Sequence, residues 1–324
     1  MTSAIPAASV PADDETENLS YVDSNIDNST VDGSVTDDSG SVTCTLDSSA
    51  NNFEFRNGRR YHVYKAGKYD LPNDEQEQER LNLQHHAWID IVGALQIAPI
   101  PNDLHDVLDI DDYMHSTYTA SPIQPTFVPP NCEFEIDDCE SDWIYHRRFD
   151  FIHGRTLTIG WRDWDKLCRQ SFKFLNPGGY LELQEATYPA ICDCPPDKHP
   201  LNPVTEYFLR ITDAAKKRKI DTKLSGELMA ERMRKAGFIN IHYKTYRAWL
   251  SNRYFHKDLL DGLEGIGLRL FTEQLGWSTE KALVYISQVR NAMKEETVNH
   301  LYFPIWICYG QKPPVEDEFT KDEQ

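Results

Sequence analysis

The sequence predicts an α/β fold in which helices flank both faces of a mainly parallel sheet. Short apolar segments typical of buried strands alternate along the chain with segments of helical periodicity, and this alternation indicates a parallel sheet. One such pair is FDFIHGR at 149–155, followed by WRDWDKLCRQSFKFLN at 161–176. The chain has 324 residues, of which 40% are hydrophobic, so it is long enough to bury a substantial core.

The N-terminal segment, residues 1–50, differs in composition from the rest of the chain. It is rich in Ser, Thr and Asp and holds ten Asp or Glu but no Lys or Arg. Such a segment cannot offset the entropy of ordering by burying apolar surface. We therefore expect a disordered acidic tail at 1–50, a folded domain at 51–314 and a polar tail at 315–324.

The first predicted helix spans about 74–95. Leu81, Trp88, Ile91, Val92 and Leu95 fall on one face at helical spacing. The preceding LPND supplies an N-cap at position 73 or 74, and a glycine followed by APIP ends the helix.

The remaining elements follow in order. The predicted strands are 106–110, 132–138, 149–155, 177–185, 238–250 and 299–313, and the predicted helices are 161–176 and 225–237, with a helical insertion at about 251–295. Gly237 is expected to close the second of these helices. Pro304 lies within the last strand and favours an edge or a bulge there.

Charge and cysteine usage restrict the classes of partner. The formal net charge is −19, so direct binding to nucleic acid or to anionic lipid is not expected. The longest apolar runs are far shorter than the roughly 18 residues that span a bilayer. Seven scattered cysteines indicate a reduced, intracellular protein. We expect a cytoplasmic protein, and the basic KKRK at 216–219 leaves a nuclear address open beside a solvated helix face.

Several kinds of catalytic site are disfavoured. The CDC at 192–194 is too short for usual zinc-ligand spacing, so no metal is expected. The sequence has no G-x-S-x-G and no P-loop. The glycines of NPGGY at 176–180 precede a strand instead of opening a helix, which indicates a structural turn.

Six strings occur together in a recognisable order. They are NGRRYHVYKAGKYDLPNDEQEQERLNLQHH, SPIQPTFVPPNCEFEIDDCESDW, FDFIHGR, LNPGGYLELQE, LFTEQLGW and YFPIWICYGQKP. In these strings the chain resembles the fungal LaeA-like class I methyltransferases, which depend on S-adenosylmethionine (SAM), over about 53–313. The resemblance implies a Rossmann-like sheet whose last two strands form an antiparallel edge, and SAM as cofactor. It also implies a role in fungal secondary metabolism, as a regulator or as a tailoring protein. The partners that it leads us to expect are a small-molecule natural-product substrate or intermediate and another protein.

One segment departs from that family. In the family a strand like VLDI, here with Asp109 at the acidic position, continues into Gly-x-Gly-x-Gly, a helix and a second strand. Here only residues 111–120 separate Ile110 from SPIQP, and they contain no glycine. A βαβ crossover needs a dozen residues or more, so the first crossover helix and most of the second strand should be absent. In the family, an acidic residue at the end of the second strand hydrogen-bonds the cofactor ribose. Here Thr119 stands at about that position.

The departure leaves three interpretations open. An active methyltransferase would have to bind SAM without the loop, which needs glycine for close backbone approach. A methyltransferase-like accessory or partner subunit would have weakened or lost SAM binding. A gene model that lacks a coding segment would give the same sequence.

The family pattern assigns further residues. Asp137, Asp138 and Cys139 stand where the family contacts adenine, and a plain polar turn is the alternative. His153 and Arg155 follow the strand that normally faces the methyl group, and His153 is a candidate base or a structural histidine. The substrate-side candidates are Tyr61, Tyr64, His85 and Trp88, with aromatic core or helix packing as the alternative.

Overall fold

The computed structural model describes residues 53–62, 71–111, 130–132, 138–194 and 202–315. The expected tail at 1–50, most of the expected strand at 132–138, and the candidate residues Tyr64 and Asp137 lie outside these ranges. No helix within the described ranges is both long and apolar enough to cross a membrane.

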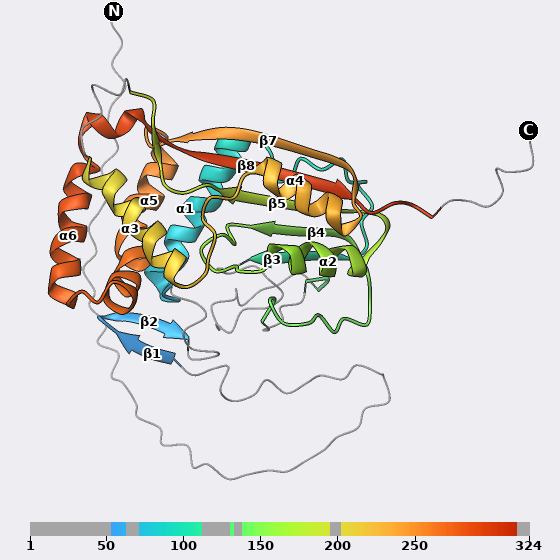
Figure 1. Cartoon of the computed structure of the whole chain (residues 1–324), viewed down its shortest axis with the longest axis horizontal. Helices are drawn as coiled ribbons and strands as arrows, with labels where there is room; N and C mark the ends of the chain where they lie inside the picture. The colour runs from blue at the N-terminus through green and yellow to red at the C-terminus, as the bar shows by residue number, and fades with distance from the viewer. Residues whose placement is uncertain (1–52, 63–70, 112–129, 133–137, 195–201, 316–324) are drawn as a thin grey trace, which may run out of the picture. The chain divides into compact units, whose positions relative to one another are not determined.

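A mixed sheet forms the centre of the fold (Figure 1). Its strands are β3 (Val107–Asp111), β4 (Phe149–Arg155), β5 (Leu175–Ala186), β8 (Leu301–Gln311) and β7 (Ile239–Trp249), in that spatial order, with the short β6 (Ile191–Cys192) also paired to β8. β3, β4 and β5 are parallel, and β8 runs antiparallel to both β5 and β7. The mainly parallel sheet and the antiparallel pair at its edge are as predicted.

Helices and one hairpin surround the sheet. The helices are α1 (Glu75–Val92), α2 (Trp164–Phe174), α3 (Pro203–Lys217), α4 (Gly226–Ala236), α5 (Arg253–Arg269) and α6 (Thr279–Ala292), with a π-helix at Leu270–Gln274 and a 3₁₀ helix at Glu296–His300. β1 (Phe53–Arg56) and β2 (Arg59–His62) form an antiparallel hairpin. The predicted insertion at 251–295 contains α5, the π-helix and α6.

α1 begins and stops at the residues that the sequence indicates, Asp74 and Gly93, but the predicted extension to Leu95 is wrong, because Leu95 lies beyond the glycine that ends the helix. Asp74 is the N-cap, and its carboxylate accepts a hydrogen bond from the backbone N–H of Glu77. Gly93 ends the helix with a φ of 83°, a left-handed conformation that glycine adopts without a Cβ clash. The helix is therefore fixed in length, and this places His85 just past its middle.

Two apolar clusters lie on the two faces of the sheet. α2 and α4 cover one face, where Leu167 and Met233 pack against Leu181 and Trp306; Figure 1 shows both helices on the same side of the strands. The second cluster joins α1, α3, α5 and α6 to residues of β8 such as Phe303. Alternation along β8 sends neighbouring side chains into different clusters, so this strand belongs to both.

The prediction that Pro304 marks an edge or a bulge is wrong. β8 lies inside the sheet, paired with β5 as far as Ala186↔Ile305 and with β7 through Arg247↔Pro304. The Pro304 carbonyl accepts from the N–H of Thr187, just past the last β5 pair. Proline has no backbone N–H, and at position 304 that donor would point towards β5 beyond the last paired residue of β5. No ladder hydrogen bond is therefore lost, and the central strand tolerates the proline.

β3 is the strand whose surroundings bear on the shortened segment. Among the described residues its one strand neighbour is β4. Val107 on β3 is about half exposed, at 49%. The residues that follow β3, 112–129, lie outside the described ranges.

Candidate functional site

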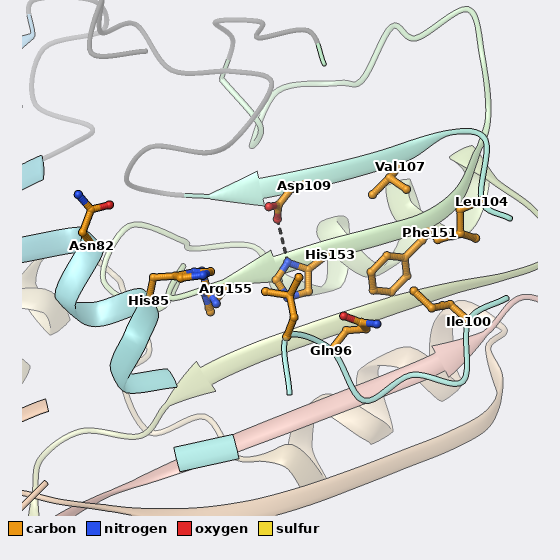
Figure 2. Close-up of a pocket in the computed structure, with 11 residues that line it drawn as sticks. Asn82, His85, Gln96, Ile100, Leu104, Val107, Asp109, Phe151, His153 and Arg155 are labelled. Carbon is orange, nitrogen blue, oxygen red and sulfur yellow. Dashed lines mark hydrogen bonds and ion pairs between the residues drawn. The ribbon is translucent and has the colours of Figure 1, made fainter. Parts of the chain in front are cut away.

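A cavity of about 570 Å³ lies against β3 and β4, on the sheet face opposite α2 and α4. Its lining comes from both strands, from α1 and from the segment that joins α1 to β3 (Figure 2). The lining residues are Asn82, His85, Leu95, Gln96, Ile100, Leu104, Val107, Asp109, Phe151, His153 and Arg155. This volume lies within the range of small-molecule sites.

Strand alternation determines which side chains reach the cavity. Val107 and Asp109 point to this face from β3, and Phe151, His153 and Arg155 do so from β4. The residues between them, such as Leu108 and Ile152, face the opposite core. Because the strands are parallel and in register, Asp109 lies beside His153, near the carboxyl ends where open α/β sheets bind ligands.

Asp109 and His153 form a hydrogen-bonded pair. The Nδ1 atom of His153 lies 2.8 Å from Oδ1 of Asp109. An ionised carboxylate can only accept, so Nδ1 carries the hydrogen of that bond. The opposite ring atom, Nε2, is buried and has no hydrogen-bond partner among the described residues. In the neutral ring Nε2 is therefore an acceptor with no partner.

Arg155 and His85 meet at the same cavity. Nη2 of Arg155 lies 2.9 Å from Nδ1 of His85. A guanidinium can only donate, so Nδ1 of His85 accepts and carries no hydrogen. This contact ties α1 to the end of β4, and Figure 2 shows the two side chains together at that end.

Two buried polar residues of β5 hold the segment between α1 and β3 in place. The Glu182 carboxylate accepts from the backbone N–H groups of Ile97, at 2.9 Å, and Ala98, at 2.5 Å. Gln184 donates to the Leu95 carbonyl at 2.8 Å and to Glu182 at 2.7 Å. We call residues 95–98 the strap; it supplies Leu95 and Gln96 to the cavity wall.

Asp138 and Cys139, the described candidates for adenine contact, are not among the residues that line the cavity. Oδ1 of Asp138 accepts from the N–H of Glu140, and Oδ2 accepts from the Ser141 hydroxyl, both at 3.1 Å. The Cys139 carbonyl accepts from the Trp143 indole at 2.9 Å. Both residues thus hold a turn together.

The substrate-side candidates separate in the structure. His85 lines the cavity, whereas Trp88 is buried in the cluster with α3 and α5. Tyr61 is also buried, and the guanidinium of Arg269 lies 5.3 Å from its ring centroid. Burial raises the pKa of the Tyr61 hydroxyl. Of these described candidates, only His85 contributes to the cavity lining.

Sequence reasoning missed most of the apolar lining. Val107 and Phe151 could have been found, because side chains two residues apart on a strand share a face. Val107 therefore lies on the same face of its strand as Asp109, and Phe151 on the same face as His153. Ile100 and Leu104 lie in an irregular connection whose path no periodicity predicts.

Glu185 lies near the carboxyl end of β5 and does not face solvent. Its side chain is fully buried and accepts from the N–H groups of Leu157 and Thr158, at 2.7 and 3.0 Å. It therefore fixes the chain that follows β4.

Within the described ranges no group of three or more His, Cys, Asp or Glu could hold a metal ion. The arrangement that remains is a mainly apolar cavity with one oriented imidazole and one imidazole–guanidinium pair. Such a site can bind a small molecule and accept a proton or a hydrogen bond at a fixed point.

The comparisons with known proteins point in one direction. A family model described as a methyltransferase domain matches residues 54–243. Methyltransferase pytC of Aspergillus terreus is 32% identical over 313 residues, which cover 85% of this chain and 93% of the relative. The probable methyltransferase tdiE of Emericella nidulans is 30% identical, covering 84% and 92%. The secondary metabolism regulator laeA of Aspergillus flavus is 24% identical, covering 81% and 78%.

Proposed function

Because this chain belongs to the methyltransferase family, we propose that it serves fungal secondary metabolism and acts on a small natural-product intermediate at the cavity of β3 and β4. The observation that carries the proposal is the Asp109–His153 pair at the carboxyl ends of two parallel strands. Ligands of open α/β sheets bind at such ends. The relatives named as methyltransferases and as regulators of secondary metabolism support this biological setting.

SAM is the methyl donor of the family, and we propose that this chain binds it weakly. The described residues fit the cofactor poorly. One oxygen of Asp109 is engaged by His153, and both oxygens of Asp138 are engaged within its turn. The sequence has no glycine from 94 to 153, where the family places its cofactor loop. A side chain at each position of that loop would hinder close approach of the backbone to the cofactor.

Calorimetric titration of SAM, and of its demethylated product, into the full chain tests this proposal. We expect dissociation constants weaker than about 100 μM, corresponding to less than roughly 5.5 kcal/mol of binding. A matched control is a chimaera that carries the family's glycine-rich loop and crossover helix between Ile110 and Ser121. The chimaera should bind more tightly, whereas micromolar binding by the unaltered chain would overturn the proposal of weak binding.

A second candidate function is that of a non-catalytic accessory with a protein partner. The outer side of β3 favours it, because β4 is the one strand paired with β3 in the described part of the chain and Val107 is half exposed. Unpaired strand edges invite pairing with another chain. Light scattering on the purified protein, alone and mixed with candidate enzymes from the same gene cluster, would test it. A monomer that binds none of them would count against an accessory role.

The place of action remains a prediction. A cytoplasmic location agrees with a small-molecule tailoring step, whereas a nuclear location would agree with the regulators among the relatives. Imaging of a tagged chain, with the KKRK segment at 216–219 intact or replaced by KQQQ, distinguishes the two.

A further inference from the structure

Within the described residues, His153 presents to the cavity a buried acceptor with no partner, and this feature identifies the kind of ligand that suits the cavity. His153 is 8% exposed and lines the cavity, and no group in the described ranges is hydrogen-bonded to its Nε2 atom. A buried polar atom left without a partner costs free energy comparable to a lost hydrogen bond. A ligand hydroxyl placed at Nε2 would remove that cost.

Asp109 fixes which hydrogen-bonding role Nε2 plays. Its carboxylate accepts from Nδ1 of His153 at 2.8 Å, so the neutral ring carries its hydrogen on Nδ1 and a lone pair on Nε2. Glu182 flanks His153 in register on the other side, but its carboxylate is engaged by the strap and by Gln184. Arg155 and His85 are engaged with each other. In the described part of the chain, none of these neighbours is hydrogen-bonded to Nε2.

The rest of the wall describes the body of the ligand. Leu95, Ile100, Leu104, Val107 and Phe151 supply apolar surface on several sides of the cavity. Phe151 also lies next to the imidazole, with ring centroids 6.0 Å apart. Aromatic and aliphatic surface of this kind, beside polar groups that are mostly paired with one another, favours flat, apolar ligands whose polar atom fixes their orientation.

We propose that this cavity binds an apolar, ring-bearing small molecule through one hydroxyl donated to Nε2 of His153, and that Asp109 is the positioning residue that keeps Nε2 an acceptor. The inference deepens the proposed function, since such a molecule would be the methyl acceptor. Binding itself requires no cofactor. The assignment also differs from the expectation that Asp109 contacts SAM.

Three matched ligands test the proposal on the full chain at pH 8, without SAM. The first, 1-naphthol, can donate and accept a hydrogen bond. The second, 1-methoxynaphthalene, can only accept one, and the third, naphthalene, can do neither. We expect 1-naphthol to bind about five- to tenfold more tightly than either of the others, the yield of one net hydrogen bond. Equal affinities, or tighter binding of 1-methoxynaphthalene, would overturn the assignment of Nε2 as an acceptor.

Variants separate recognition from general damage to the fold. His153→Phe should bind naphthalene at least as well and lose the preference for 1-naphthol, while His146→Phe, which changes an exposed histidine outside the lining, should keep it. In Asp109→Asn the side-chain amide can donate to Nδ1, which moves the ring hydrogen to Nε2. Long-range ¹H–¹⁵N NMR should then show a changed tautomer at His153, and the preference for 1-naphthol should fall. A retained preference in His153→Phe contradicts the proposal.

The outcome is independent of the cofactor titration. Discrimination of 1-naphthol without measurable SAM binding would support both this inference and the proposal of weak SAM binding. Tight SAM binding with no discrimination would instead reject both. Each of the mixed results rejects one of them alone.

Discussion

At the scale of single residues, Asp258 gives the sharpest pH prediction. It is completely buried on α5, where it accepts from Arg80 at 2.5 Å, and Arg80 also donates to Glu77 at 2.8 Å. Burial raises the Asp258 pKa to about 6, although the Arg80 charge opposes the shift. The folded protein therefore holds a proton at pH 5 that the unfolded chain has released. Stability from this group is greatest below about pH 4 and falls as pH rises to about 6.

Asp258→Asn tests that sign. The free energy of unfolding of the wild type, minus that of the variant, should decrease by about 2 kcal/mol between pH 4 and pH 6.5, because the asparagine does not titrate. Urea unfolding at several pH values measures this difference. It should be constant above pH 7, and a difference that is flat over the whole range would contradict the raised pKa.

Individual site residues were predictable where the family resemblance assigned them. Asp109, His153 and Arg155 were expected at the site because the family places functional residues near the ends of these two strands. The pairing of Asp109 with His153 could not, since it depends on the register between two strands 44 residues apart. Trp88 and His85 are three residues apart on α1, yet one is core and the other lines the cavity. Helical periodicity alone does not separate two such neighbours.

At the scale of elements, the strap depends on Glu182. Glu182→Gln keeps the size of the side chain but replaces one acceptor oxygen with a donor that faces a backbone N–H. Hydrogen bonds to a charged group are worth about 1.5–3 kcal/mol, so amide exchange at Ile97 and Ala98 should accelerate about ten- to a hundredfold. Hydrogen exchange with peptide mapping measures it. Glu280→Gln on exposed α6 is the control, and unchanged exchange in Glu182→Gln would refute this role.

Two elements were missed, although the sequence contains signals for both. Asn57 and Gly58 form the turn of the β1–β2 hairpin with φ of 51° and 79°, as Asn-Gly turns of this kind require. Asn202 caps α3, and Pro203 occupies its first turn. The basic residues Lys216 and Lys217 are exposed at the end of α3, where the helix stops. The π-helix at Leu270–Gln274 has no comparable local signal.

At the scale of the whole molecule, the two apolar clusters should unfold together, because β8 supplies side chains to both. Leu167 on α2 and Leu263 on α5 are fully buried in different clusters. Leu167→Ala and Leu263→Ala should each lower stability by about 2–5 kcal/mol and shift one common transition. Far-UV circular dichroism and tryptophan fluorescence in urea would show coincident curves. Two separate midpoints in either variant would show that the clusters unfold independently.

The class of fold was predictable because many short patterns agree on it, each strand and helix adding its own evidence. The place of the last strand was harder to predict, since sequence order does not specify the order of strands in space. Proline at 304 favoured an edge on local grounds. The actual position depends on where the β5 ladder ends, which is a tertiary property.

The central position of β8 also governs how a nascent chain matures. Until residues 301–311 have left the ribosome, β5 and β7 each lack the neighbour that they share in the native sheet. Such incomplete chains would expose unpaired strand edges, which can pair with one another or bind chaperones. A stop codon only a few residues before Leu301 would therefore leave a product prone to aggregation and degradation, even though the Asp109–His153 pair was already synthesised.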